Sequence, residues 1–125
     1  MKKLLIPLLA VAIATGTTKT ANDYSEPSLV RCTVYTADEG SITASGDEVR
    51  EGIVAGRKEW LGMTALLYDT DMNFIGFYEF KDCGGAKGLK NGTVIDVFRE
   101  DKVDCREWVA QYGDHVYMQI VDAKG

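Results

Sequence analysis

The sequence predicts a mainly β protein, built as a small six-stranded barrel with one short helix before the last strand. Two observations support this fold class. About six short segments are apolar or alternate between apolar and polar residues, and a single segment has helical spacing. A closed barrel suits many short strands, because closure removes the exposed strand edges that an open sheet would leave. The length of 125 residues fits one domain.

The predicted strands share alternation or a short apolar run bounded by turn residues, and they are residues 29–37, 52–55, 63–69, 73–82, 93–98 and 114–123. A loop rich in Gly, Ser, Thr and acidic residues joins the first two. The third and fourth flank the sequence Thr-Asp-Met-Asn and are expected to form a hairpin.

The helix is predicted from residues at i, i+3, i+4 and i+7, which share one helix face: Cys105, Trp108, Val109 and Tyr112. Trp108 and Tyr112 are therefore expected mostly in the core. Asp104, with Glu107 three residues later, resembles a capping box at the helix start. Gly113 suits the C-terminal stop.

The N-terminal sequence MKKLLIPLLAVAIATG has the layout of a secretory signal peptide, with two lysines, an apolar run and small residues. The apolar run is shorter than the ~20 residues of a membrane span. Cleavage is expected at the A-x-A of residues 12–14 or near Ala21, and an uncleaved anchor is the alternative. The protein is therefore expected to be secreted or periplasmic, without a stable membrane span after cleavage. The expected organisation is a signal peptide and start of the mature chain at 1–21, a polar connector at 22–29 and a barrel domain at 30–125.

The mature chain is expected to be acidic. Three of the 14 basic residues lie within the first 21 positions, which leaves 11 basic against 19 acidic side chains, a net charge of −8. This charge makes nucleic acid a poor partner. It does not exclude a glycan, because sugars are held by stacking and hydrogen bonds rather than by a long-range field.

Cysteines and the single histidine give no metal signature. Cys32, Cys83 and Cys105 allow three disulfide pairings in an exported protein, and the sequence does not choose among them. No CxxC or Cys/His spacing suggests zinc, and His115 has no partner for a histidine-based site. No metal and no cofactor are expected.

Two aspartates carry the candidate chemistry. Asp82 ends a long strand before the Cys-Gly-Gly sequence at 83–85, where glycines let the backbone turn or approach another segment closely. Asp96 interrupts the apolar strand 93–98. Burial without a partner raises the pKa of a carboxyl. A raised pKa suits a general acid near neutral pH. The alternative is that Asp96 accepts hydrogen bonds from amides of the Gly-rich loop and fixes a turn.

The order of these segments resembles the three-aspartate domain, a double-psi β-barrel similar to the catalytic barrel of membrane-bound lytic transglycosylase A and, more distantly, to rare lipoprotein A and the expansins. The resemblance covers roughly residues 30–122. The matching motifs are Thr43-x-Ser45-Gly46, Gly52 to Ala55, Asp82-x-Gly84-Gly85-Ala86-Lys87-Gly88, Ile95-Asp96-Val97-Phe98 and Tyr112-Gly113.

This resemblance implies an enzyme that cleaves the β-1,4 bond between N-acetylmuramic acid and N-acetylglucosamine in peptidoglycan, and the protein is expected to be a monomer. A lytic transglycosylase uses the C6 hydroxyl of its substrate as the nucleophile, so one carboxyl can serve first as acid and then as base. The resemblance makes Asp96 that acid and base, and Asp82 the neighbour that holds its proton. Tyr35 and Trp60 could stack on sugars or belong to the core or rim. The expected substrate-binding residues are Thr43, Ser45, Gly84, Gly85, Lys87 and Arg57.

Two departures from the family pattern keep alternatives open. Arg57 stands nearest the position of the remaining family aspartate, where it could bind the lactyl or peptide carboxylates of muramic acid or could mark lost catalysis. The two aspartates also lie three positions farther apart than usual, which predicts a longer loop with its turn tip at Asn91-Gly92. The alternatives are a non-catalytic, expansin-like module that binds or loosens the wall, an inverting glycosidase, and an interaction protein of the envelope or of a phage particle.

Overall fold

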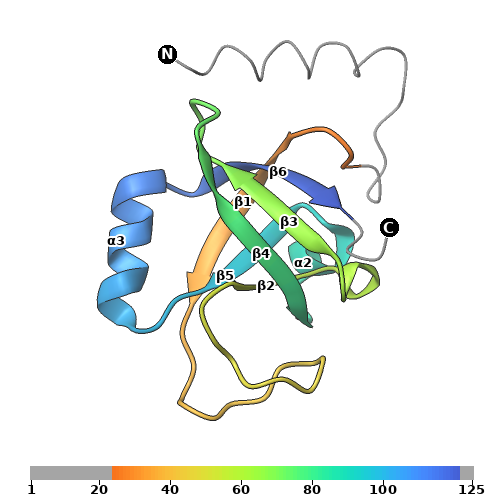
Figure 1. Cartoon of the computed structure of the whole chain (residues 1–125), viewed down its shortest axis with the longest axis vertical. Coiled ribbons are helices and arrows are strands. Elements are labelled where there is room, and N and C mark those ends of the chain that lie inside the picture. Colours follow the sequence, from red (N-terminus) through yellow and green to blue (C-terminus); the bar gives the residue numbers. More distant parts are fainter. Residues whose placement is uncertain (1–23, 122–125) are drawn as a thin grey trace.

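The computed structural model describes residues 24–121, which form a closed six-stranded barrel (Figure 1). The strands are β1 (Ser28–Tyr35), β2 (Ile53–Gly56), β3 (Thr64–Tyr68), β4 (Phe74–Cys83), β5 (Val94–Phe98) and β6 (His115–Val121). The helices are η2 (Lys58–Trp60, a 3-10 helix), α2 (Lys87–Asn91) and α3 (Lys102–Tyr112). None of the helices in this part of the chain has the length and apolarity needed to cross a membrane. The predicted mainly β barrel, with a helix before the last strand, is confirmed; the predicted signal peptide lies outside the described residues.

The strand order around the barrel is β1-β5-β2-β4-β3-β6, and β6 closes the ring by pairing with β1. Two pairs are parallel, β1 with β5 and β2 with β4, whereas the other four are antiparallel. The antiparallel pairing of β3 with β4 confirms the predicted hairpin. Because β5 and β2 lie side by side, the chain brings segments from both halves of the sequence next to each other.

Alternation along the strands separates a closed core from an outer face. In β5, Ile95 and Val97 are fully buried, and Asp96 between them is half-buried. Trp60 is 2% exposed and contacts Phe80, with ring centroids 5.2 Å apart. The structure therefore assigns Trp60 to the core and removes it from the candidates for sugar stacking.

Helix α3 lies against one side of the barrel, on the opposite side from α2 (Figure 1). Its N-cap is Asp101, whose side chain accepts a hydrogen bond from the Asp104 amide at 2.9 Å. The predicted capping box beginning at Asp104 is therefore wrong, since Asp104 already lies in the first helical turn. The predicted stop at Gly113 is confirmed, with φ of 72°, and Trp108 is 4% exposed as expected of a core residue.

The segment between the two aspartates folds into the short helix α2, which the sequence analysis expected as a loop. Helix α2 ends at Asn91, and its C-cap Gly92 is left-handed with φ of 85°, so the chain turns at Gly92 as predicted, whereas Asn91 is the last helical residue. A Cβ atom at Gly92 would also lie 2.8 Å from the Arg57 Cδ atom. Gly92 therefore provides both the turn and the close approach to Arg57.

The predicted polar connector is partly integrated into the barrel. Strand β1 begins at Ser28, two residues before the predicted boundary. Tyr24 packs edge-on against Trp60 at 5.4 Å, and its hydroxyl donates a hydrogen bond to the Gly92 carbonyl at 3.3 Å. The start of the described chain thus covers part of the core.

All three cysteines lie in the described part of the chain, and all three are free thiols. Cys32 is buried in β1, whereas Cys83 at the end of β4 and Cys105 on α3 are half-buried. Burial raises the pKa of Cys32 to about 12, which makes it an unreactive core side chain. None of the three possible disulfides is formed.

Candidate functional site

Four residues form a row across four neighbouring strands on the outside of the barrel. Thr33 in β1 pairs with Asp96 in β5, Asp96 pairs with Ala55 in β2, and Ala55 pairs with Asp82 in β4. Residues at matched positions of neighbouring strands project to the same face, so both carboxylates share the outer face with the Thr33 hydroxyl. Two inter-strand spacings separate the backbones of Asp96 and Asp82, which is about 10 Å.

A β-bulge places Asp82 in this row. Val54 pairs with Phe80, but the next residue, Ala55, pairs with Asp82, so the register shifts by one residue at Lys81. Phe80 is fully buried, and strict alternation from it would turn Asp82 toward the core. The bulge instead re-aims Asp82 to the outer face, a common use of bulges next to functional sites.

Asp96 is a half-buried carboxyl with one protein donor in the described chain. The Thr33 hydroxyl lies 2.8 Å from Asp96 Oδ1, and it also lies 3.3 Å from the Ile95 carbonyl oxygen. Burial raises the pKa of Asp96, the Thr33 hydrogen bond lowers it, and the Asp82 charge raises it, with a net upward shift. The alternative in which amides of the Gly-rich loop hold Asp96 is therefore wrong, because its donor within residues 24–121 is a strand side chain.

Asp82 has more hydrogen-bond donors than Asp96. Its Oδ1 accepts from the Cys83 amide at 3.0 Å and from the Ala44 amide at 3.1 Å. The Tyr35 hydroxyl donates to Oδ2 at 3.5 Å. Burial and the charges of Asp82 and Asp96 raise the pKa of Tyr35 well above its usual range, so this hydroxyl stays protonated and available as a donor. Asp82 therefore connects the end of β4 to a loop and to β1.

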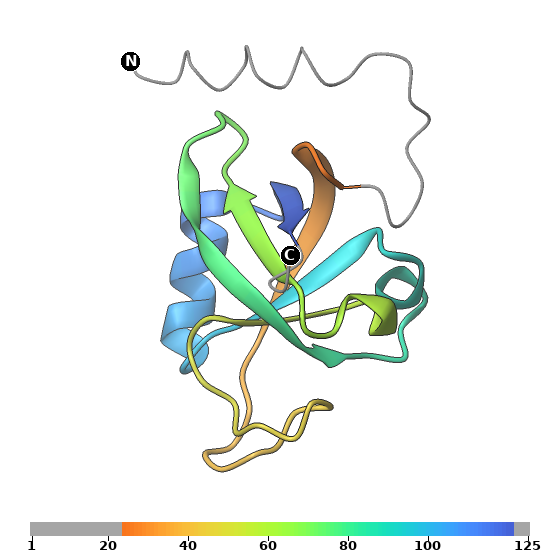
Figure 2. The same cartoon turned by 45° about the vertical axis from the view of Figure 1, so that its right-hand side comes forward.

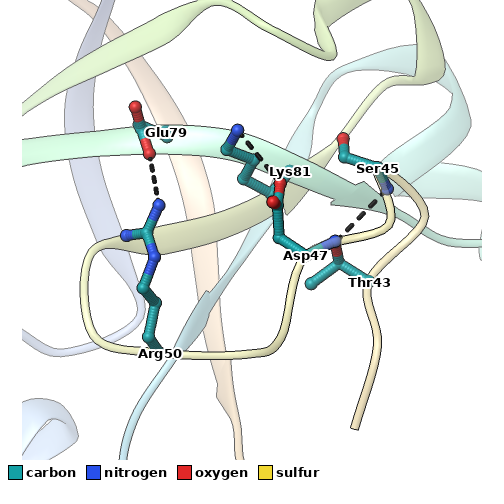
Figure 3. Close-up of polar contacts among 6 residues, drawn as sticks. All are labelled: Thr43, Ser45, Asp47, Arg50, Glu79 and Lys81. Atoms are coloured by element: carbon teal, nitrogen blue, oxygen red, sulfur yellow. Dashed lines mark hydrogen bonds and ion pairs between the residues drawn. The ribbon is translucent and has the colours of Figure 1, made fainter.

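The loop between β1 and β2, residues 36–52, projects beyond one end of the barrel and returns to contact β4 (Figures 1 and 2). Its turn is organised by Thr43, which is 4% exposed and whose hydroxyl oxygen accepts from the amides of Ser45 and Asp47, both at 3.3 Å. The Ser45 amide also donates to the Lys81 carbonyl at 3.0 Å. Lys81 forms an ion pair with Asp47 at 3.1 Å (Figure 3).

A second ion pair, between Arg50 of the same loop and Glu79 of β4 at 2.9 Å, also holds the loop against this strand (Figure 3). These contacts locate the two predicted substrate-binding residues of the loop. Thr43 is buried and supports the turn, whereas the exposed residue Ser45 anchors the loop through its amide. The loop therefore brings the Ala44 amide, rather than the Thr43 hydroxyl, to the row of aspartates.

Arg57 does not lie with the aspartates in a shared cluster of contacts. Its side chain is 16% exposed, and its guanidinium pairs with Glu59 at 3.3 Å. The same group donates to the Asn91 carbonyl at 3.4 Å and lies 5.9 Å from the centre of the Trp60 ring. Its contacts therefore join η2 to the end of α2, and its guanidinium is already engaged where the sequence analysis expected a substrate anion.

The remaining predicted residues follow Asp82 along the chain. A Cβ atom at Gly84 would lie 2.5 Å from the Leu89 Cδ1 atom, so this glycine permits the close packing of α2 against the end of β4. Gly85 faces open space, and Lys87 is exposed at the start of α2. These positions border the row rather than forming part of it.

The sequence analysis did not identify Thr33 or Ala44 as members of the site. Thr33 could have been found from its position, because it alternates with buried Cys32 and must face outward beside the strand that carries Asp96. No local signal identifies Ala44, since its contribution is a backbone amide delivered by the loop. Tyr35, a candidate for sugar stacking, instead contacts Asp82 through its hydroxyl.

The chemistry of the row is that of carboxyls and hydroxyls. Within residues 24–121, no group of three or more His, Cys, Asp or Glu side chains is arranged to hold a metal ion. Asp96 can release a proton and take one up. The Thr33 hydroxyl can donate to the carboxylate form, and it can turn to the Ile95 carbonyl when Asp96 is protonated. The row can therefore perform general acid and base catalysis.

Comparison with known proteins adds no identification: no family model matches the chain, and no curated protein is significantly similar to it.

Proposed function

We propose that the protein is a peptidoglycan lytic transglycosylase in which Asp96 acts first as general acid and then as base. The observation that carries the proposal is the raised pKa of Asp96 on the outer face of the barrel. A half-buried carboxyl with a raised pKa retains its proton closer to neutral pH than an exposed aspartate does. The motifs shared with the three-aspartate domain supply the substrate class.

In the proposed reaction, protonated Asp96 donates its proton to the glycosidic oxygen as the bond between that oxygen and C1 of N-acetylmuramic acid breaks. The Asp96 carboxylate then removes the proton of the C6 hydroxyl, whose oxygen bonds to C1 and closes the 1,6-anhydro ring. Asp96 ends the cycle protonated, as it began. Because the nucleophile belongs to the same sugar, no second molecule has to be captured from solution.

Thr33 and Asp82 assist Asp96 in different ways. The Thr33 hydroxyl follows the two protonation states, donating to the carboxylate or to the Ile95 carbonyl. The Asp82 charge favours the protonated form of Asp96 before the reaction. Asp82 also binds the Ala44 amide, which holds the 36–52 loop beside the row. The glycan strand would then lie across the outer face, bordered by this loop.

The proposed setting is the cell envelope, outside the cytoplasm, where peptidoglycan strands are accessible. The N-terminal signal-like sequence supports export. The acidic mature chain agrees with a substrate held by hydrogen bonds and stacking rather than by strong charge attraction.

An inverting glycosidase is the second candidate, because two carboxyls share the outer face of the barrel. Inverting enzymes hold their carboxyls roughly 6.5 to 9.5 Å apart to leave room for water, whereas retaining enzymes hold them roughly 5 to 5.5 Å apart. The backbones of Asp96 and Asp82 lie two strand spacings, about 10 Å, apart. This distance is compatible with the wider class.

Digestion of purified sacculi with the mature protein, followed by mass spectrometry of the muropeptides, separates these candidates. A lytic transglycosylase releases 1,6-anhydro products, whereas an inverting hydrolase releases only products with reducing ends. Sacculi that bind the protein and stay intact, while a known muramidase digests them in parallel, would contradict both enzymatic proposals and favour a wall-binding module.

A further inference from the structure

A cavity of about 300 Å³ lies directly beyond Asp82, between η2, the end of β4 and α2. This lysine cavity is lined by Lys58, Glu59, Cys83, Gly84 and Lys90. Figure 2 shows η2 and α2 next to each other at this edge of the barrel. Cys83 pairs with Gly56, one position beyond the pair of Asp82 with Ala55. The lysine cavity is therefore the next feature along the same two strands.

The lysine cavity has an excess of positive charge. Its one carboxylate, Glu59, is paired with Arg57 at 3.3 Å. Within residues 24–121, no carboxylate lies within ion-pair distance of Lys58 or Lys90. Two lysines without an ion-pair partner among the described residues thus line one cavity, in a chain whose net charge is −5.

We propose that the lysine cavity binds a carboxylate of the substrate, namely the lactyl-peptide substituent of N-acetylmuramic acid. This inference rests on the proposed function, because it takes peptidoglycan as the substrate. A lysine ammonium acts as a compact, mobile point charge and can follow a flexible carboxylate without the fixed geometry that arginine imposes.

The assignment also explains the position of Arg57. The sequence analysis expected Arg57 to receive the muramyl carboxylates, but its guanidinium is held by Glu59 and Asn91. Arg57 instead pairs with Glu59, the one carboxylate that lines the lysine cavity, and so offsets its charge. Arg57 is therefore a positioning residue for the lysine cavity, and Lys58 and Lys90 make the contact.

Binding of muramyl dipeptide tests this assignment without catalysis, since this ligand has no glycosidic bond to cleave. Its affinity is measured by NMR titration of the whole protein, beside fully N-acetylated chitotetraose as an uncharged sugar and glycerol phosphate as another anion. The double variant Lys58→Gln/Lys90→Gln is compared with Lys102→Gln, which removes an exposed lysine from α3 on the other side of the barrel.

We expect the double variant to bind muramyl dipeptide about fivefold to tenfold more weakly, because two partly exposed charge contacts are lost. Its affinity for chitotetraose and its thermal unfolding should not change, and Lys102→Gln should match the wild type. The wild-type affinity for muramyl dipeptide should also fall with added salt. Equal affinity of the double variant and the wild type for muramyl dipeptide would overturn the assignment, and so would absence of binding or tighter binding of glycerol phosphate.

The sacculus digest separates failure of this subsite from failure of the proposed function. If the wild type and the double variant release anhydro products equally and bind muramyl dipeptide equally, the carboxylate subsite is contradicted and the transglycosylase proposal stands. If muramyl dipeptide binds in a lysine-dependent way but sacculi stay intact, the carboxylate subsite stands and the transglycosylase proposal is contradicted.

Discussion

Asp82 and Asp96 occupy matched positions on either side of Ala55, yet their surroundings differ. Asp82 accepts hydrogen bonds from two backbone amides and the Tyr35 hydroxyl. Asp96 accepts one, from the Thr33 hydroxyl, and its pKa is raised. The strand register gives both residues access to the outer face, whereas contact with the 36–52 loop makes Asp82 an anchor.

This difference divides the work of the site. A carboxylate that accepts hydrogen bonds from two amides and a hydroxyl joins three segments of the chain and suits a structural role. A half-buried carboxyl with one mobile hydroxyl partner can exchange a proton at lower cost to its surroundings. We therefore expect substitutions of Asp96 to affect chemistry and substitutions of Asp82 to affect structure.

The largest expected effect is on activity. Asp96→Asn should reduce the release of anhydro products from sacculi by about 10² to 10⁴-fold, because the amide cannot supply a proton in general acid catalysis. The fold should persist, since an asparagine oxygen can still accept from Thr33. Mass spectrometry of the digests measures the loss.

The matched control is Asp71→Asn, which makes the same chemical change at an exposed residue between β3 and β4. It should retain wild-type activity. If Asp96→Asn has full activity and a wild-type circular dichroism spectrum, Asp96 is not the general acid. The proposed difference in role between Asp96 and Asp82 would then be wrong.

The next effect is on stability. Asp82→Ala removes the acceptor of the Ala44 and Cys83 amides, and hydrogen bonds to a charged group are each worth about 1.5 to 3 kcal/mol. We expect a loss of about 3 kcal/mol in the free energy of unfolding, the lower end for two such bonds, measured with urea. Hydrogen exchange at the Ala44 amide should accelerate more than exchange at amides of α3. Unchanged protection of Ala44 would show that Asp82 does not anchor the loop.

The outline of the barrel could be predicted from the sequence because its strands carry local signals. Alternation around Cys32 and the apolar frame of Asp96 both report which side chains face the core. The helix stop at Gly113 is equally local. The start of α3 was misplaced because Asp101 and Asp104 both fit a capping pattern, and the backbone conformation at Asp101 decides between them.

The details of the site could not be predicted, because they depend on contacts between distant segments. The bulge at Lys81 reverses the orientation that alternation assigns to Asp82. The Ala44 amide reaches Asp82 across 38 positions of the chain, and Arg57 finds Asn91 across 34. Residue type alone suggested a substrate-binding role for Arg57. Packing against Trp60 and Gly92 determines the position of its guanidinium group, and this packing cannot be predicted from residue type.

A finer test uses the two neighbours that shift the pKa of Asp96 in opposite directions. Thr33→Val removes a hydrogen bond that lowers this pKa, so the pKa should rise further. Asp82→Asn removes a charge that raises it, so the pKa should fall. The side-chain carboxyl carbon of Asp96, followed by NMR across a pH titration, reports both. Shifts in the same direction would contradict the assignment of one neighbour as donor and the other as charge.

The smallest expected effect is on the pH dependence of stability. Because the pKa of Asp96 is higher in the folded chain than its ordinary value of 3.8, the folded state binds more protons between those two values. The contribution of Asp96 to the free energy of unfolding must therefore fall as the pH rises through this interval. Asp96→Asn lacks this titration, so it should gain stability relative to the wild type between pH 3.8 and the folded pKa, and keep that gain at higher pH. Urea unfolding at a series of pH values measures the difference, and a relative loss of stability with rising pH would show that the surroundings of Asp96 favour its charged form.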